Sequence, residues 1–475
     1  PGGEPATREA QRQLLFFCTS LHNRSLRKPP PVVLSKSLTA FTPHYAEDVT
    51  YDLKALVTDI DDNVDLLHLL QSLFPDDWKH FTERLGVHQL QRPEAIDANE
   101  LCRWASDRAQ VLSRTVRGVM TCADALRVLG RLEGVAEGEL EALVGAKFEY
   151  LCTCQIYGKL KASSKAADLW KARGIDELLR QFSPHLKVGY VEGPVKEADG
   201  DAFYSCLLGI DAHGAQQVQY KVKLPGNPII GEGKPENQNQ AVIFARGECL
   251  QTLDMNQDMY LGEAYKMRNL LEGFRGNVHL VGFREHIFSE SGGAVANFAA
   301  SNEFVFGTIV QRFMTWPLCV RFHYGHPDVW DKVWAVSNGG VSKASKTLHV
   351  SEDIFGGINV VLRGGAVEYY EFIHCGKGRD MGFIAVNGFE QKVSTGNAMQ
   401  LVSRDVYRLT KGFDLFRLLS LYITGTGFYF TTTLTIYAVH FLALSQLVLL
   451  LTGTSAFHGG YRYWDPPEAA DDADA

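Results

Sequence analysis

The sequence predicts an α/β fold, because segments with strand character alternate with helical segments along most of its 475 residues. Strand character is clear at 147–158, KFEYLCTCQIYG, and at 279–288, HLVGFREHIF. Helical character is clear in ANELCRWASDRAQVLSRTVRGVM, where apolar residues recur at steps of three and four. A third observation adds a membrane element, since no charged residue lies in the stretch from Leu418 to Tyr461.

The elements are expected in the following order. A short strand in VVLSKSLTAFTPHYAED ends at Pro43, and helices follow over about 50–145, which we interpret as an insertion into the α/β domain. After the strand at 147–158, the runs 204–211 and 217–225 predict a hairpin with a short connection. The run QAVIFARGECLQTLD predicts a buried strand, and NLLEGF and SRDVYRL predict helices and connectors around it.

Composition limits the class of protein. Hydrophobic residues make up 45% of the chain and charged residues 21%, which is enough apolar surface to fold. The 47 Lys and Arg against 55 Asp and Glu give a net charge of −8, so a nucleic-acid partner is not expected. The nine cysteines are scattered without a zinc spacing and suggest a reducing, cytosolic environment. The acidic end, WDPPEAADDADA, is typical of a disordered tail.

One segment is long enough to span a bilayer. The uncharged run Phe428 to Leu451 ends in LALSQLVLLLTG, and its length suits a hydrocarbon core of about 30 Å. A buried helix of a soluble core is the alternative, which the threonines and His440 would permit. Before this run, Lys411 and Arg417 alternate with aromatic residues, a pattern that suits the surface of a bilayer.

The glycine-rich stretch GNPIIGEGKPENQN is a candidate ligand loop. It matches neither the Walker A pattern nor the dinucleotide pattern, so a P-loop ATPase and an NAD enzyme are excluded. Lys234 nevertheless lies close to three amide side chains, Asn237, Gln238 and Asn239, just before an expected strand. Such a set can bind a diphosphate, and a plain surface loop is the alternative.

Two pairs of carboxylates follow apolar runs. Asp254 and Asp258 flank Asn256 after CLQTL, where they could hold a divalent cation, with Mg2+ the expected ion. The alternative is helix capping by either aspartate. Glu352 and Asp353 in HVSEDIFGG could supply a general base, again with capping as the competing role.

A basic turn, CGKGRDMG, places Lys377 and Arg379 among glycines. It could hold an anion or form a salt-bridged turn. The sequence has no H-E-x-x-H and no G-x-S-x-G motif, so hydrolase chemistry of those kinds gains no support.

The motifs together resemble those of the 1,3-β-glucan synthases, which include callose synthases and fungal glucan synthases. The likeness lies in GEGKPENQNQAVIFARGECLQTLDMNQDMYLGEAYKMRNLL, GFREHIFSE, RFHYGHPDVWDK, GGVSKASKTLHVSEDIFGG and CGKGRDMGF. Upstream it continues through FTPHYAEDV, FPDDWKHF, LCRWASDRAQVLSRTVRGVM and FEYLCTCQIYG, and it covers about Leu38 to Leu451. So extended a likeness is highly specific.

The resemblance implies a processive membrane enzyme of cell wall biogenesis. It would transfer glucose from UDP-glucose to the 3-hydroxyl of a growing β-1,3-glucan (callose) chain, with inversion at the anomeric carbon. The fold implied is a GT-A-like α/β glycosyltransferase domain with a helical insertion, followed by a C-terminal transmembrane helix. The domain would be cytosolic at the plasma membrane, and a Rho-type GTPase is an implied regulatory subunit.

The resemblance also assigns roles to residues of this chain. The catalytic residues it implies are Lys234, Asp254 and Glu352, of which Glu352 is the expected base. The residue pattern adds Asp353 as a catalytic candidate and Asp254 and Asp258 as metal ligands. Members of the family usually carry Glu where this chain has Met399, which affects the acceptor side. The substrate-binding residues it implies are Pro43, Tyr45, Glu47, Asn237, Asn239, Lys377, Arg379, Lys392, Gln400 and Arg404.

The expected domain organisation follows. Residues 1–25 are a polar start, 26–412 the glycosyltransferase domain, 413–455 an interfacial and transmembrane segment, and 456–475 an acidic disordered tail. An alternative function is a catalytically silent scaffold or regulatory member of a glucan synthase complex. A synthase that uses UDP-GlcNAc is a second enzymatic alternative.

Overall fold

The structure is a computed structural model of the whole chain. It forms two compact units, Pro1–Leu418 and Leu419–Ala475. The residues that it describes are 28–45, 47–61, 64–86, 96–316, 318–321, 327–343, 352–379 and 381–452. The polar start, 1–25, the tail, 456–475, and Asp380 therefore lie outside the described residues.

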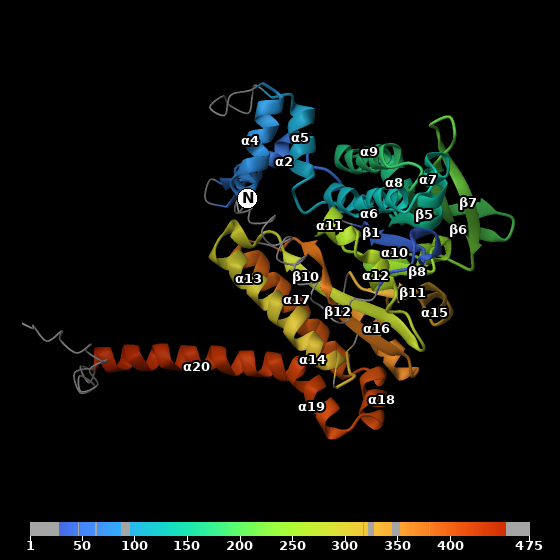
Figure 1. Cartoon of the computed structure of the whole chain (residues 1–475). Coiled ribbons are helices and arrows are strands. Elements are labelled where there is room, and N and C mark those ends of the chain that lie inside the picture. Colours follow the sequence, from blue (N-terminus) through green and yellow to red (C-terminus); the bar gives the residue numbers. More distant parts are fainter. Residues whose placement is uncertain are drawn as a thin grey trace, which may run out of the picture. The chain divides into compact units, whose positions relative to one another are not determined.

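The first unit is built on a ten-stranded sheet (Figure 1) with the strand order β7-β6-β5-β4-β1-β8-β11-β10-β12-β9. The sheet is mixed, with both parallel and antiparallel neighbours. The α/β prediction is therefore confirmed. The strands are β1 (Leu38–Pro43), β4 (Phe148–Thr153), β5 (Leu186–Glu197), β6 (Gly200–Ile210), β7 (Gln216–Leu224), β8 (Cys249–Thr252), β9 (Gln257–Asp258), β10 (Val278–Ile287), β11 (Val329–Asp331) and β12 (Ala366–Lys377).

The strand directions bring chemistry-bearing segments to one edge of the sheet. β1 runs parallel to both β4 and β8. β11 is antiparallel to β8 and to β10, and β12 is parallel to β10, so β8, β10 and β12 all run in the same direction. The carboxyl ends of β1, β4, β8, β10 and β12 therefore meet at one edge, where ligands of open α/β sheets usually bind.

Helices cover both faces of the sheet (Figure 1), and each face has its own apolar cluster. The larger cluster joins the strands to α6 (Leu112–Leu132), α7 (Glu137–Lys147), α8 (Tyr157–Ala162), α9 (Ala166–Gln181), α11 (Leu261–Ala264) and α12 (Met267–Leu271). The smaller cluster packs the opposite face against α10 (Lys234–Ala241), α15 (Lys332–Ser337) and α16 (Glu352–Leu362).

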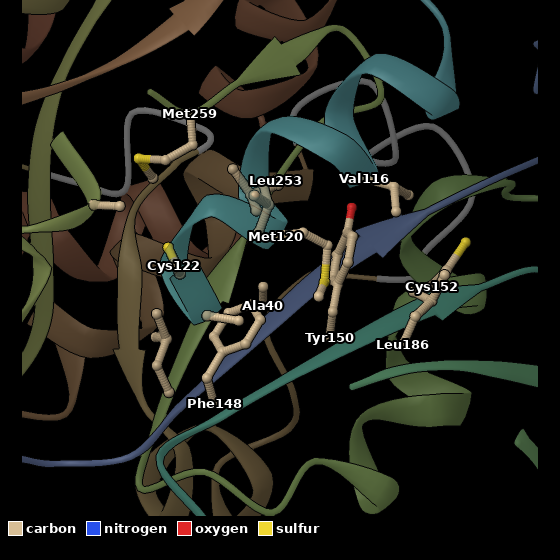
Figure 2. Close-up of a cluster of buried hydrophobic side chains, with 14 of the residues drawn as sticks. Ala40, Val116, Met120, Cys122, Phe148, Tyr150, Cys152, Leu186, Leu253 and Met259 are labelled. Atoms are coloured by element: carbon tan, nitrogen blue, oxygen red, sulfur yellow. The ribbon is translucent and has the colours of Figure 1, made fainter. Parts of the chain in front are cut away.

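Alternation along β4 explains how the larger cluster forms. Phe148, Tyr150 and Cys152 point to the same face, as expected of every second residue in a strand, and they pack beneath Met120 of α6 (Figure 2). The Tyr150 hydroxyl donates a hydrogen bond to Thr42 Oγ1 at 2.8 Å, so its polar atom is satisfied within the core.

The chain between β1 and β4 is mainly helical, with a small two-stranded sheet formed by β2 (Asp59–Asp61) and β3 (Val64–Asp65). Its first helices have a separate apolar core that includes Leu70, Phe81 and Trp104. Pro75 is the first residue of α4, because proline suits the first turn of a helix but not its interior. These helices are α2 (Leu53–Leu56), α3 (Leu66–Leu73), α4 (Pro75–Arg84) and α5 (Ala98–Ser106).

One prediction of strand character is wrong in part. The run 240–254 forms a strand only at β8, because α10 and a 3-10 turn at Val242–Phe244 occupy its first half. A short apolar run does not distinguish a buried helix from a strand by periodicity, which is the reason for this error. Glu352 and Asp353 begin helix α16, so the backbone there is not extended. The preceding run ASKTLHV lies outside the described residues.

The remaining helices follow β10 and β12. The second unit consists, in its described part, mainly of α20, which is uncharged, and its threonine hydroxyls donate to carbonyls one turn earlier. Mean hydropathy reaches 2.0 within α20, which makes it long and apolar enough to cross a membrane. These helices are α13 (Ala294–Phe304), a π-helical turn (Val305–Val310), α14 (Gln311–Thr315), α17 (Phe383–Leu401), α18 (Arg404–Gly412), α19 (Leu415–Thr424) and α20 (Thr426–Leu451).

Candidate active site

Three residues predicted from the sequence meet at the carboxyl edge of the sheet. Lys234 is the first residue of α10, Asp254 follows β8 by two positions, and Lys377 ends β12. Lys234 Nζ lies 2.8 Å from Asp254 Oδ1. Lys377 Nζ lies 3.6 Å from Asp254 Oδ2. One carboxylate is therefore shared by two ammonium groups, and we call Lys234, Asp254, Lys377 and Glu285 the ionic cluster.

Glu285, on β10, completes this cluster, and the sequence analysis missed it. Its oxygens lie 3.1 and 3.2 Å from Lys377 Nζ. Gln257 also donates a hydrogen bond to this carboxyl group. Burial raises the pKa of Glu285 to about 8, against the opposing effect of Lys377. An acidic residue inside the apolar run GFREHIF is the signal that could have identified it.

The cluster joins two lysines to two acidic residues. Burial favours the protonated form of Glu285 and the Lys377 ammonium group favours its carboxylate, so the two groups titrate together. Burial alone would lower the pKa of Lys377, but the Glu285 and Asp254 carboxylates outweigh it and the pKa is raised. Two ammonium groups converge on Asp254, which is the more exposed partner in both pairs, at 27%. Such a site suits an anionic ligand.

The loop after β8 and the residue after β12 are joined by two hydrogen bonds between Asn256 and Gly378. Asn256 Nδ2 donates to the carbonyl of Gly378 at 3.0 Å, and the amide of Gly378 donates to the carbonyl of Asn256 at 2.8 Å. Beside them, Arg379 Nε donates to Glu303 of α13 at 3.0 Å. Arg379 is therefore placed next to the site but is engaged in an ion pair.

Asp258, the second predicted metal ligand, is held elsewhere. Arg114 Nε lies 2.9 Å from its Oδ2, while Asp254 is paired with two lysines. Within the described residues, no group of three or more His, Cys, Asp or Glu side chains is arranged to hold a metal ion. The side chains as placed do not form a cation site, because each carboxylate is already neutralised by basic groups. The metal assignment stays a prediction.

Two of the amide residues act as scaffolding for the loop. Asn237 is fully buried, and its Nδ2 donates to the carbonyl oxygens of His44 and Thr153 at 2.7 and 2.9 Å. It thereby ties α10 to the ends of β1 and β4. Pro43 is the last residue of β1, and Tyr45 packs against the larger apolar cluster. Asn239 Nδ2 donates to the carbonyl of Ser342 at 2.6 Å.

Other predicted residues lie outside the ionic cluster. Lys392 and Arg404 are exposed on α17 and α18, and Gln400 is buried near the end of α17. Glu47 is exposed in the loop after β1. Asp353, the second residue of α16, accepts a hydrogen bond from the amide of Ile354 at 2.9 Å, and the Glu352 side chain is not described. An acidic side chain in the first turn of a helix is favourable.

The fold and the site define an α/β protein in which two lysines and an aspartate converge at the carboxyl edge of the sheet. The protein-family model described as 1,3-beta-glucan synthase component matches residues 4–101 and 90–458. The chain therefore belongs to the 1,3-β-glucan synthase family. The resemblance of the sequence to this family is confirmed.

Similar curated proteins are callose synthases of Arabidopsis thaliana. Putative callose synthase 8 is 43% identical over 477 residues, a match that covers 94% of this chain and 24% of that protein. Callose synthase 7 is 42% identical over 481 residues, with the same two coverages, 94% and 24%. The chain thus spans about a quarter of the length of the curated relatives it matches.

Solved structures show more distant likeness. A mannosyltransferase from Pyrobaculum calidifontis in complex with GDP-Man and Mn2+ is 11% identical, with a TM-score of 0.38, covering 92% of this chain and 88% of that one. Mannosyl-3-phosphoglycerate synthase from Rubrobacter xylanophilus is 12% identical, with a TM-score of 0.34 and 82% coverage of each chain. Neither likeness assigns a role to any residue of this chain.

Proposed function

We propose that this chain carries the catalytic part of a 1,3-β-glucan synthase, which transfers glucose from UDP-glucose to a growing β-1,3-glucan. The observation that carries the proposal is the ionic cluster at the carboxyl edge of the sheet, in a chain that belongs to this family. The mixed sheet with helices on both faces is consistent with a GT-A-like domain over residues 26–412.

The chemistry of transfer matches the charges of the cluster. The acceptor 3-hydroxyl oxygen forms a bond to the anomeric carbon while the bond from that carbon to UDP breaks, which inverts the configuration in one step. The leaving diphosphate gains negative charge, which Lys234 and Lys377 would stabilise. Asp254 would offset the repulsion between the two ammonium groups, so that they stay close together and oriented before the donor binds.

The hydroxyl proton needs an acceptor, and we assign it to the Glu352 carboxylate at the start of α16. The same proposal includes contacts to the substrate from four further residues, Tyr45, Lys392, Gln400 and Arg404. A divalent cation, with Mg2+ expected, would assist the diphosphate if it bound, and titration with EDTA and Mg2+ measures that dependence. Because Asp254 and Asp258 are already paired with basic groups, no step is assigned to a metal.

Lys234→Ala tests the stabilisation of the leaving group. We expect kcat to fall about 10²-fold or more, because a preorganised electrostatic contact to developing charge is lost. The control is Lys223→Ala, which removes a lysine of the edge strand β7 that is 56% exposed and paired with Glu197. If Lys234→Ala leaves kcat and the KM for UDP-glucose unchanged, the segment GNPIIGEGKPENQN has no role in donor binding or transfer.

The membrane part of the proposal concerns 413–455. We infer that α20 spans the bilayer, that α19 approaches it, and that the domain faces the cytosol at the plasma membrane, where a Rho-type GTPase could act as regulator. The support is the composition of α20, which has no charged residue in its 26 residues.

An insertion reporter measures whether α20 spans a membrane. The segment Thr426–Leu451 should integrate and resist carbonate extraction, because its backbone groups are satisfied internally and its surface is apolar. The control carries Leu442→Arg with Val439→Arg, where each arginine costs about 2.5–3.5 kcal/mol at a helix centre. Extraction of the unmodified segment by carbonate would show that α20 is not a membrane helix.

The donor is tested with the full natural protein in detergent, offered UDP-glucose and UDP-GlcNAc in separate reactions. Polymer from UDP-glucose alone is expected. Polymer from UDP-GlcNAc alone would identify the other processive synthase class. No polymer from either donor, with the protein folded, would favour the scaffold role.

A further inference from the structure

The loop that presents Asp254 is anchored through its far end. Asp258, the last residue of β9, faces Arg114 of α6, whose Nε and Nη2 both lie 2.9 Å from Asp258 Oδ2. The two side chains are only 6% and 13% exposed. A buried pair with two contacts to one oxygen fixes position strongly, and removing either partner leaves an uncompensated charge.

Gly118 makes room for the same carboxylate. It lies one helical turn after Arg114 on the same face of α6. A Cβ at Gly118 would lie 1.9 Å from Asp258 Oδ1 and 2.8 Å from the amide nitrogen of Met259. Glycine inside a helix lowers stability by about 0.5–1 kcal/mol relative to alanine. At position 118 this cost accompanies the close approach of the loop, which leaves no room for a Cβ.

The near end of the loop is held by the same helix. Thr115 Oγ1 donates to the carbonyl of Met255 at 2.7 Å, and both groups are buried. Met255 follows Asp254 directly, so α6 contacts the loop near both of its ends, through Met255 and through Asp258.

Arg114 is itself rigidly placed. Its guanidinium carbon lies 3.5 Å from the centre of the Phe288 ring and 5.6 Å from that of Phe74. Its Nη1 donates to the carbonyl of Arg108. Phe288 follows β10 and Phe74 precedes α4, so the arginine is braced from two directions.

We propose that Arg114 and Gly118 are positioning residues that hold the loop 254–258 through the Asp258 carboxylate, and so fix Asp254 between Lys234 and Lys377. This gives Asp258 a structural task in place of the metal role predicted from the sequence. The consequence for transfer rests on the proposed function, whereas the anchoring of the loop does not.

The test compares Gly118→Ala, Asp258→Ala and their combination in the full natural protein. The first readout is hydrogen exchange of the peptide that spans 254–259, and the second is glucose transfer per folded molecule. We expect faster exchange and a loss of transfer of about 10- to 100-fold in each single variant, the scale of a small misplacement. The combination should stay within about twofold of Asp258→Ala alone, because both changes release the same contact.

Two further variants separate positioning from general damage. Gly130→Ala, on the same helix, would press on the Leu140 side chain at 2.6 Å and should lower thermal stability while leaving exchange at 254–259 and transfer unchanged. Arg114→Lys keeps the charge but loses the two-point contact, and should also lose transfer while folding normally.

The inference is overturned if exchange at 254–259 stays as in the wild type in Gly118→Ala, if the two losses multiply in the combination, or if Gly130→Ala and Gly118→Ala behave alike. Wild-type transfer in Arg114→Lys would overturn it as well. If the wild-type protein makes no glucan, the proposed function fails, and the exchange data alone then decide whether the loop is anchored as inferred.

Discussion

Asp254→Asn should abolish polymer formation while the protein still folds and enters the membrane. Asp254 contacts both Lys234 and Lys377, at 2.8 and 3.6 Å. An amide in its place cannot balance two ammonium groups, so the lysines would separate and lose the arrangement that receives the diphosphate. The loss of one preorganised contact lowers kcat by about 10²–10³-fold. Asp254→Asn disturbs two contacts, so we expect the rate of transfer to fall by more than about 10³-fold.

Incorporation of labelled glucose into polymer, per folded molecule, measures this loss. The matched control is Asp124→Asn, a carboxylate of α6 that is 60% exposed and pairs with Arg127. It should polymerise like the wild type, since exposed pairs contribute little. Near-normal turnover by Asp254→Asn would show that transfer does not need the Asp254 carboxylate.

Glu352→Gln should bind UDP-glucose nearly as the wild type does but lose transfer by about 10²–10⁴-fold, the usual contribution of general base catalysis. Glutamine keeps the size and hydrogen bonding of glutamate and removes its basicity. Because both residues begin α16, adjacent side chains point about 100° apart around the helix, so only one of them can serve the acceptor hydroxyl.

Asp353→Asn is the internal comparison. Asp353 accepts a hydrogen bond from the Ile354 amide, so its loss should cost about 1 kcal/mol of stability or less and leave transfer largely intact. Donor binding and transfer are measured together for both variants. Normal transfer in Glu352→Gln, with Asp353→Asn inactive but still binding donor, would assign the base to Asp353.

Local signals predicted much of the sheet. β1 ends at Pro43 as expected, and β6 and β7 pair antiparallel as the hairpin pattern indicated. The segment 234–244 was not predicted as a helix, because its apolar end suits a helix or a strand equally well. Pro235, in the first turn of α10, is a signal for the start of a helix. Proline is favoured in a first helical turn, and this preference outweighs the strand character of VIF.

The ionic cluster was predictable only in part. Lys234, Asp254 and Lys377 are each marked by a local motif, and strand direction brings them together. Glu285 is marked only as an acidic residue in an apolar run, and Arg114 has no local signal. Their partners are distant in sequence: Asp258 lies 144 positions from Arg114, and Lys377 lies 92 from Glu285. Contacts over such separations depend on the order of strands in the sheet, which a single sequence does not reveal.

The measurement that tests the central claim most directly is the linkage of the product. The full natural protein is incubated with labelled UDP-glucose, and the polymer is digested separately with an endo-1,3-β-glucanase and an endo-1,4-β-glucanase. We predict that the first enzyme converts all labelled polymer to soluble fragments and the second leaves it intact, with no polymer from Asp254→Asn. A polymer that resists the 1,3-specific enzyme, or the absence of any polymer from the folded wild-type protein, would contradict the account.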